Sequence, residues 1–302
     1  LTTPAHTQVF PRPSPMKKVS LVLSSGGARG YAHIGAIEAL EAAGYEIASV
    51  AGTSMGALIG GMYAAGRLQE VKEWMCGIGH KEMFSLTDWS LSLNHIVKGN
   101  RVMDALQELV PDVRIEELPI PFCAVATDLE TRLEVAFRKG SLFRAIRSSI
   151  SIPTVFKPVS IGPHTLVDGG LVNPLPLNRV KRHPDDLLIS VNVGAPSTPE
   201  AAALRQRDSE EREGRMSRWL ERIMPEAMRR GLDANVVNLL LDAFDIMIQR
   251  NSILAQKITP PDISVDIPIN RFGLFDFDRA ADIIEAGRTA MNEALQRAER
   301  PE

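Results

Sequence analysis

Residues 47–56 read IASVAGTSMG, an apolar run followed by the pattern G-x-S-x-G. The run predicts a buried strand, and the apolar residues that follow predict a helix over residues 55–65, with Ser54 at the tight turn between them. Gly52 and Gly56 lie two residues on either side of Ser54, where a Cβ atom would collide at such a turn. The helix directs the positive end of its dipole at Ser54, which favours a developing anion there. The pattern therefore predicts Ser54 as a nucleophile, and the alternative is an idle serine in a glycine-rich turn.

Strand-like apolar runs alternate with helical patterns along the rest of the chain. We expect further strands at residues 18–24, 122–126, 134–137, 165–167, 187–193 and 263–267, and helices at residues 31–43, 142–149, 236–248 and 282–297. This alternation predicts an α/β fold of three layers, α/β/α, with a largely parallel central sheet. Residues 47–66 carry no charge and are long enough to span a bilayer. Their five glycines and β-like start favour a strand, turn and buried helix instead.

The length and charge of the chain bound its organisation. Its 302 residues carry a net charge of −3 from 34 basic and 37 acidic side chains. We expect residues 16–302 to form a single domain and the proline-rich residues 1–15 to be a disordered leader or an expression remnant. Balanced charge gives no reason to expect a nucleic-acid partner. Without a secretory signal we expect a cytoplasmic protein, with Cys76 and Cys123 as reduced thiols.

Residues 205–255 are predicted to be helical, and part of this segment has two faces of different character. An apolar stripe at residues 216–228 opposes several arginines. Such a stripe most often packs on the protein's own core. The alternatives are a lid over the site and peripheral contact with an anionic membrane surface.

A glycine-rich loop, SSGGARG at residues 24–30, follows the first expected strand. Consecutive glycines let backbone N–H groups converge on an anion, which could be a phosphate or the oxyanion of an acyl-transfer intermediate. Neither G-x-G-x-x-G nor G-x-x-x-x-G-K-[ST] is present, which disfavours a nucleotide, and a simple packing turn remains open. We predict oxyanion donors at Gly26, Gly27 and Ala28. Arg29 and Gly30 would support the loop, although Arg29 could equally be a surface charge.

A serine nucleophile needs a base, and the histidines are poorly placed to provide it. The four that follow Ser54 end at His183, and His33 precedes it, so we read them as surface or helix-packing residues. Asp168 follows an apolar strand and precedes Gly169 and Gly170, which would allow close approach of the carboxylate. An ordinary aspartate has a pKa of about 3.9. Burial would have to raise that pKa for Asp168 to act as base, and a plain turn is the alternative.

Together these blocks resemble the patatin-like phospholipase family. The resemblance rests on the loop at residues 26–30, the elbow at 52–56 and the Asp-Gly-Gly block at 168–170, supported by residues 32–35, 126–131, 151–159 and 173–174. It extends over about residues 17–195 and is greatest for compact bacterial members that are similar to the esterase domain of neuropathy target esterase. One departure is Ser25, which stands where the family usually has a glycine and would be strained at positive φ.

The resemblance implies a lipid acyl hydrolase with a Ser54–Asp168 dyad and neither metal nor cofactor. Its substrates would be phospholipids, lysophospholipids or related acyl lipids. The alternative is a non-catalytic protein of the same fold that binds acyl lipids or regulates another protein. The sequence identifies neither the preferred lipid nor the oligomeric state.

Overall fold

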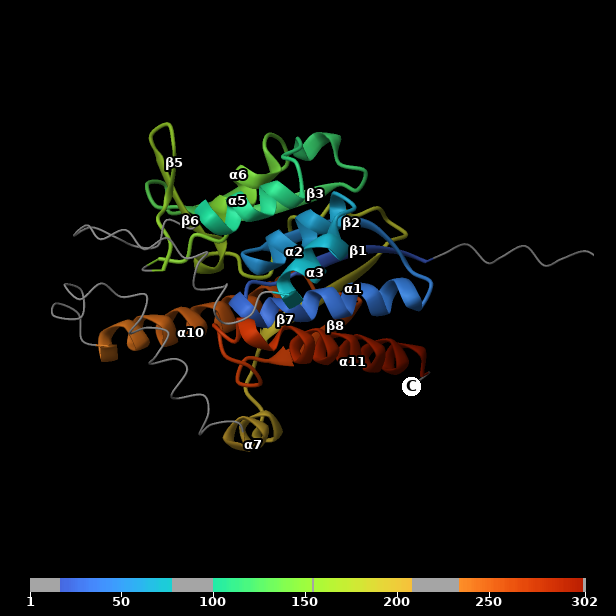
Figure 1. Ribbon diagram of the computed structural model, residues 1–302. Coiled ribbons are helices and arrows are strands. Elements are labelled where there is room, and N and C mark those ends of the chain that lie inside the picture. Colours follow the sequence, from blue (N-terminus) through green and yellow to red (C-terminus); the bar gives the residue numbers. More distant parts are fainter. Residues whose placement is uncertain (1–16, 78–99, 154, 208–233, 301–302) are drawn as a thin grey trace, which may run out of the picture.

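The computed structural model describes residues 17–77, 100–153, 155–207 and 234–300, and these form a sheet of eight strands flanked by helices (Figure 1). The strand order is β5-β6-β3-β2-β1-β7-β8, with β4 paired to β3. The strands are β1 Lys18–Leu23, β2 Glu46–Thr53, β3 Phe122–Asp128, β4 Glu134–Phe137, β5 Val159–Ile161, β6 His164–Asp168, β7 Leu187–Ala195 and β8 Ile263–Pro268. The five strands from β3 to β8 are parallel. Strands β4 and β6 pair antiparallel with β3, and β5 pairs antiparallel with β6. The predicted largely parallel sheet is confirmed.

The five helices predicted at residues 31–43, 55–65, 142–149, 236–248 and 282–297 are present with shifted ends, whereas α3, α5 and most of α7 were not predicted. They are α1 Ala32–Ala42, α2 Met55–Ala64, α3 Leu68–Gly77, α5 Asn100–Leu109, α6 Leu142–Ser149, α7 Pro199–Arg207, α10 Ala234–Ile258 and α11 Ala280–Glu299. Short 3₁₀ turns occur at η1 Gly27–Tyr31, η2 Ile115–Glu117, η3 Gly169–Leu171 and η4 Phe277–Arg279. The helix expected at residues 236–248 is α10, and it continues ten residues further because no breaker precedes Pro260.

One face of the sheet carries the main hydrophobic core. It is formed by β-strand residues such as Leu21 and Leu23 together with side chains of α1, α2, α6 and α11. Helices α1 and α11 lie side by side (Figure 1) and approach backbone to backbone. A Cβ atom at Gly35 would lie 1.8 Å from the Ile284 carbonyl oxygen, and one at Gly287 would lie 1.9 Å from that of Ala32. Two glycines therefore set the close spacing of this helix pair.

The opposite face is covered by the extended segment that follows η3 and by α10. Val22 and Leu188, which alternate with the core residues of β1 and β7, pack there against Leu175 and Leu177, and Ala255 of α10 joins them. The second covering layer predicted from the sequence is therefore partly helical and partly irregular.

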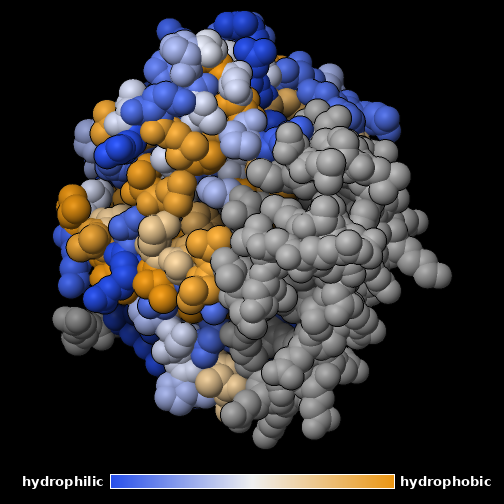
Figure 2. Space-filling model, turned by 90° about the vertical axis from the view of Figure 1, so that its left-hand side faces the viewer, coloured by the Kyte–Doolittle hydropathy of each residue, from blue (hydrophilic) through white to orange (hydrophobic). Residues whose placement is uncertain are grey.

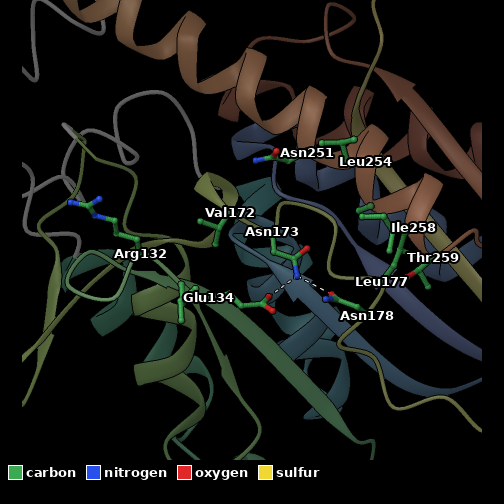
Figure 3. Close-up of a pocket in the computed structure, with 12 residues that line it drawn as sticks. Arg132, Glu134, Val172, Asn173, Leu177, Asn178, Asn251, Leu254, Ile258 and Thr259 are labelled. Atoms are coloured by element: carbon green, nitrogen blue, oxygen red, sulfur yellow. Dashed lines mark hydrogen bonds between the residues drawn. The ribbon is translucent and has the colours of Figure 1, made fainter.

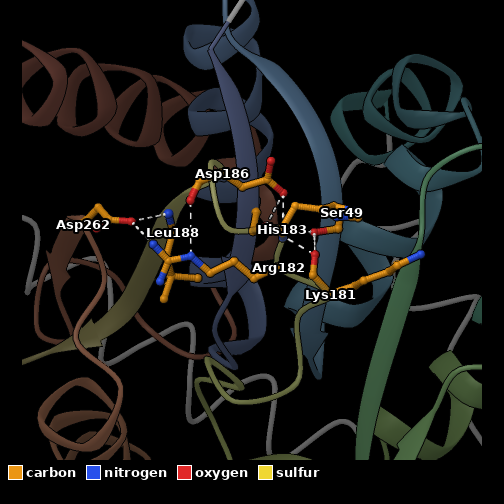
Figure 4. Close-up of polar contacts among 8 residues, drawn as sticks. Ser49, Lys181, Arg182, His183, Asp186, Leu188 and Asp262 are labelled. Atoms are coloured by element: carbon orange, nitrogen blue, oxygen red, sulfur yellow. Dashed lines mark hydrogen bonds and ion pairs between the residues drawn. The ribbon is translucent and has the colours of Figure 1, made fainter.

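A polar network ties the sheet together in the first halves of β1 and β2, before their carboxyl ends (Figure 4). Ser20 Oγ donates to Asp186 Oδ2 at 3.1 Å, and Ser49 Oγ donates to the Lys181 carbonyl oxygen at 2.5 Å. Asp262 accepts from Arg182, with 2.6 Å between Nη2 and Oδ2. These contacts anchor the segment before β7 and lie on β1 and β2 well before Ser54.

Two further expectations concern the uncharged stretch and the cysteines. Residues 47–66 form β2, the turn at Ser54 and α2, as expected. Among the described residues, no helix combines the length and apolar character that crossing a membrane would need. Cys76 is exposed, Cys123 is buried, and both are free. The expected leader at residues 1–15 and the stripe at residues 216–228 lie outside the described residues.

Candidate active site

Ser54 lies at the sharp turn from β2 into α2 and has φ 56° and ψ −123°. Positive φ is unfavourable for a serine and persists only where neighbouring groups hold it. Here the Ser54 N–H donates to Ser149 Oγ at 2.8 Å, and Ser149 Oγ in turn donates to the Val125 carbonyl oxygen at 2.6 Å. Ser149 is the last residue of α6 and is fully buried. The strained turn is thus fixed from outside by a residue on a neighbouring helix.

The glycines on both sides of Ser54 are required by close backbone approach. A Cβ atom at Gly52 would lie 2.3 Å from the Gly56 carbonyl oxygen. One at Gly56 would lie 2.3 Å from the Leu23 carbonyl oxygen at the end of β1. Both distances are below any tolerable contact, so the elbow packs directly against the adjacent strand, as the spacing in the sequence predicts.

Asp168 ends β6 and contacts Ser54 directly. Ser54 Oγ donates to Asp168 Oδ2 at 2.5 Å, and Gly170 N donates to Oδ1 at 2.7 Å. The Asp168 backbone is held by Thr127 Oγ1, which donates to its carbonyl oxygen at 2.9 Å. Asp168 is fully buried, and this burial raises its pKa to about 7, against the lowering effect of the hydrogen bonds from Ser54 and Gly170. A carboxylate with this pKa is balanced between base and acid near neutral pH.

The glycine loop lies beside these two residues. A Cβ atom at Gly170 would lie 3.0 Å from Ser25 Oγ, and one at Gly30 would lie 2.3 Å from Met55 Cγ at the start of α2. Gly27 has the positive φ, 56°, and Ser25 does not, so the strain expected for a serine in the loop does not arise. The loop therefore meets both the elbow and the Asp-Gly-Gly turn.

The backbone N–H groups of the loop are not equivalent, and one predicted donor is already used. The Ala28 N–H donates to the Leu274 carbonyl oxygen at 2.9 Å, so Ala28 is not available as an oxyanion donor in this structure. Among the described residues, no hydrogen bond uses the N–H of Gly26 or Gly27. The prediction of three donors is thus reduced to Gly26 and Gly27, because a segment distant in sequence occupies the third.

Arg29 is a buried residue of the loop, and the alternative of a surface charge is wrong. Its side chain is 3% exposed and forms a bidentate ion pair with Asp245 of α10, with 2.6 Å between Nη2 and Oδ1. Arg29 Nε donates to the Gly26 carbonyl oxygen at 3.1 Å, and Nη1 donates to that of Ile269 at 3.2 Å. Arg29 therefore links the loop to α10 and to the chain beyond β8.

None of the described histidines hydrogen-bonds to Ser54 or Asp168. His33 is fully buried on α1, and its Nε2 lies 2.9 Å from the Ser24 carbonyl oxygen. Burial lowers its pKa to about 4, so it is neutral at physiological pH. His164 pairs with Asp128 at 2.8 Å, and His183 lies in the turn before β7. His80 and His95 lie outside the described residues.

An apolar cluster lies against the glycine loop and the Asp-Gly-Gly turn. Phe244 reaches the Asp-Gly-Gly turn, since its Cζ would lie 3.2 Å from a Cβ atom at Gly170, and Leu274 lies against Gly27. The buried members come from the loop after α6, from α10 and from the segment after β8: Ile152, Val155, Leu241, Phe244, Ile248 and Leu274. Ser54 itself is 2% exposed.

A separate pocket of about 400 Å³ lies between α10 and the residues that directly follow η3 (Figure 3). Asn251, Leu254 and Ile258 of α10 line one wall. Val172 and Asn173 line the facing wall, where Asn173 Nδ2 donates to Glu134 Oε2 at 2.7 Å. The Asn173 carbonyl oxygen accepts from Thr53 Oγ1 at 2.8 Å, so the pocket shares a wall with the elbow without including Ser54 or Asp168.

The sequence analysis missed two residues of the site, Ser149 and Asp245. Ser149 falls within a predicted helix and directly precedes residues 151–159, one of the blocks behind the family resemblance, which is the only local signal for it. Asp245 lies more than 200 residues from Arg29 in an apolar helix, so nothing local in the sequence indicates their pairing.

Several known proteins are similar to this chain. The profile described as patatin-like phospholipase matches residues 21–180. The chain is 40% identical to an uncharacterized NTE family protein of Mycobacterium tuberculosis over 79% of this chain and 64% of that protein. It is 33% identical to the neuropathy target esterase sws of Drosophila melanogaster, over 59% of this chain and 13% of that protein. Among solved structures, VipD from Legionella pneumophila gives a TM-score of 0.47 at 13% identity, covering 94% of this chain and 67% of that chain.

The match to the family includes all three blocks that meet at Ser54, and it spans more than half of the chain. The chain spans less than two thirds of the length of the mycobacterial relatives. On the extent of the profile match, the chain belongs to the patatin-like phospholipase family.

Proposed function

We propose that this protein is a serine lipid acyl hydrolase that cleaves carboxylic ester bonds of phospholipids, lysophospholipids or related acyl lipids. The observation that carries the proposal is the 2.5 Å contact between Ser54 Oγ and a fully buried Asp168 whose pKa is raised to about 7. Membership of the patatin-like phospholipase family supports the same reaction class.

In the proposed first half-reaction, the Asp168 carboxylate takes the proton of Ser54 Oγ while Oγ attacks the ester carbonyl carbon. The negative charge moves to the carbonyl oxygen, where the N–H groups of Gly26 and Gly27 and the positive end of α2 would stabilise it. When the tetrahedral intermediate collapses, the carbon–oxygen bond to the alcohol breaks. Asp168 returns its proton to that alcohol, and the acyl group stays on Ser54.

In the second half-reaction, water replaces the alcohol. Asp168 takes a proton from the water as it attacks the acyl-enzyme, and a second tetrahedral intermediate forms in the same place. Its collapse releases the fatty acid and restores the Ser54 hydroxyl, with the proton returned from Asp168. Both half-reactions thus use the ester, one water molecule and the same residues of the chain.

The apolar cluster around Phe244 and Leu274 supports an acyl substrate. Its side chains lie against the glycine loop and the Asp-Gly-Gly turn, where an acyl chain entering the site would contact them. Because Ser54 is only 2% exposed, an ester must displace neighbouring groups to reach Oγ. An acyl chain that enters among the side chains of the cluster keeps their apolar surface out of water. This favours acyl over polar ligands.

Peripheral contact with a membrane surface is a further part of the proposal, and the exposed side of α10 supports it. Figure 2 shows apolar side chains gathered on the face at the left of Figure 1. The exposed large apolar residues of α10 are Leu239, Leu240, Ile246, Met247, Leu254 and Ile258. Arg250 and Lys257 are exposed on the same helix and would favour anionic lipids. Substituting both Leu254 and Ile258 with aspartate should lower binding to anionic vesicles. Unchanged binding would contradict the proposed membrane contact.

Hydrolysis of a chromogenic acyl ester and of a panel of lysophospholipids tests the proposed reaction. Ser54→Ala and Asp168→Asn should each reduce turnover to background while circular dichroism shows intact folding. Turnover at wild-type rates by either variant would contradict the dyad. A wild-type protein that binds acyl lipids without any turnover would favour the non-catalytic alternative.

A further inference from the structure

The ion pair between Arg29 and Asp245 has a geometric consequence for the glycine loop. The carbonyl oxygen of Gly26 accepts from Arg29 twice, from the backbone N at 3.2 Å and from Nε at 3.1 Å. A trans peptide is planar, so its C=O and N–H point in opposite directions. Fixing the Gly26 carbonyl oxygen therefore also fixes the direction of the Gly27 N–H, which is one of the two remaining oxyanion donors.

Arg29 can hold that carbonyl only if its own guanidinium stays in place, and Asp245 is the charged group that keeps it there. Two parallel hydrogen bonds join Nη1 and Nη2 of Arg29 to the two carboxylate oxygens, a geometry that restrains the guanidinium plane as well as its position. The Arg29 side chain is 3% exposed and that of Asp245 29% exposed. A buried guanidinium without its carboxylate would move toward solvent or another acceptor.

Resting on the proposed hydrolytic function, we propose that Asp245 is a positioning residue for the oxyanion site: through Arg29 and the Gly26 carbonyl it aims the Gly27 N–H. Asp245 is a positioning residue and not a catalytic one, because the hydrogen bonds of its carboxylate within the described residues go to Arg29 and not to Ser54 or Asp168. The positive charge of Arg29 also matters, since a cation bound to the Gly26 carbonyl polarises the shared peptide and makes the Gly27 N–H a stronger donor. Helix α10, which lies outside the part matched by the family profile, would thereby contribute to the reaction.

The test compares Asp245→Asn with Asp242→Asn, which makes the same chemical change at an exposed position one turn earlier on α10. Three quantities are measured with the full chain. These are kcat and KM for a chromogenic acyl ester, and Ki for an acyl trifluoromethyl ketone, whose adduct with Ser54 places an oxyanion in the site. Loss of one oxyanion donor costs roughly 10²–10³-fold in kcat, so partial misalignment should cost about tenfold or more.

For Asp245→Asn we expect kcat to fall by about tenfold or more, KM to stay within about twofold, and Ki to rise by the same factor as kcat/KM falls. Asp242→Asn should match the wild type. A merely structural role would lower the melting temperature without this parallel change. A folded Asp245→Asn protein with wild-type kcat and Ki would overturn the inference, whereas a wild-type protein without hydrolysis would overturn the proposed function instead.

Arg29→Lys provides the second test if Asp245→Asn does not fold. A lysine ammonium can reach Asp245 or the Gly26 carbonyl but lacks the fork that binds both. It should therefore show the same fall in kcat and the same rise in Ki at nearly unchanged KM. The double variant should lose no more than the larger single loss, because both residues act on one peptide. Additive losses, or a wild-type Ki for Arg29→Lys, would contradict the inference.

Discussion

Replacing Asp168 with asparagine should make the protein more stable above pH 7 while it abolishes turnover. The wild-type carboxyl group is fully buried, and burial raises its pKa from 3.8 to about 7. Between these two pH values the folded state keeps a proton that the unfolded state has lost. Because the folded state then binds more protons than the unfolded state, the wild-type free energy of unfolding falls as pH rises from about 4 to about 7.

The magnitude follows from the size of the shift. A shift of about 3 pKa units at about 1.4 kcal/mol per unit gives a cost of about 4 kcal/mol, which is complete above pH 7. Asparagine carries no charge and avoids this cost at every pH. Its amide oxygen can still accept from Gly170 N, and its amide group can donate to Ser54 Oγ. The quantity to compare is the free energy of unfolding of Asp168→Asn minus that of the wild type. Between pH 4 and pH 8 this difference should therefore rise by up to about 4 kcal/mol.

Urea unfolding of both proteins at pH 4, 5, 6, 7 and 8 measures this difference, with the m-values confirming that the same surface is exposed in each case. Asp242→Asn, measured at the same pH values, controls for the loss of an exposed carboxylate on α10. A flat difference for Asp168→Asn between pH 4 and pH 8, or one that falls as pH rises, would refute the reasoning about burial.

Three further predictions concern the rate and the fold. The value of kcat/KM should rise as pH increases through about 7, because Asp168 ionises there. A rise in kcat/KM near pH 4 instead would show a carboxylate with an ordinary pKa and contradict the prediction. Ser149→Ala should lower kcat at nearly unchanged KM, because it removes the hydrogen bond that holds the Ser54 backbone at positive φ. Ser149→Thr keeps a hydroxyl and should restore kcat. Equal kcat for the wild type and both variants would contradict this. Gly287→Ala should lower the melting temperature strongly, since its Cβ would lie 1.9 Å from the Ala32 carbonyl oxygen, whereas Gly77→Ala, with no atom within 4 Å, should not.

Much of the fold could be predicted from local pattern. Each buried strand reads as an apolar run, and glycines punctuate the turns at both ends of the run that becomes β2, so the alternation of strands and helices is visible in the sequence. The elbow was predictable for the same reason: Gly52 and Gly56 are required by contacts within a few residues and by the neighbouring strand. The antiparallel β5 and β6 beside β3 were less accessible, because hairpin placement depends on pairing between distant segments.

The parts that the sequence did not reveal are contacts between remote segments. Ala28 looks like an available donor until the Leu274 carbonyl, almost 250 residues later, is seen to bind it. From the sequence Arg29 could either support the loop or lie on the surface, and only the position of Asp245 on α10 decides between the two. Likewise the pKa of Asp168 depends on full burial, which a three-residue block cannot specify. In each case tertiary packing decides which groups are available for chemistry.

The central claim, that Ser54 carries the acyl group during ester hydrolysis, is tested most directly by trapping the intermediate. Wild-type protein is mixed with a chromogenic acyl ester and quenched in acid within a single turnover. The quenched protein is digested, and the masses of its peptides are measured by mass spectrometry. The account predicts the mass of one acyl group on the peptide that contains Ser54, and no such adduct in Ser54→Ala. Rapid hydrolysis with the acyl group on another residue, or turnover by Ser54→Ala at the wild-type rate, would contradict it.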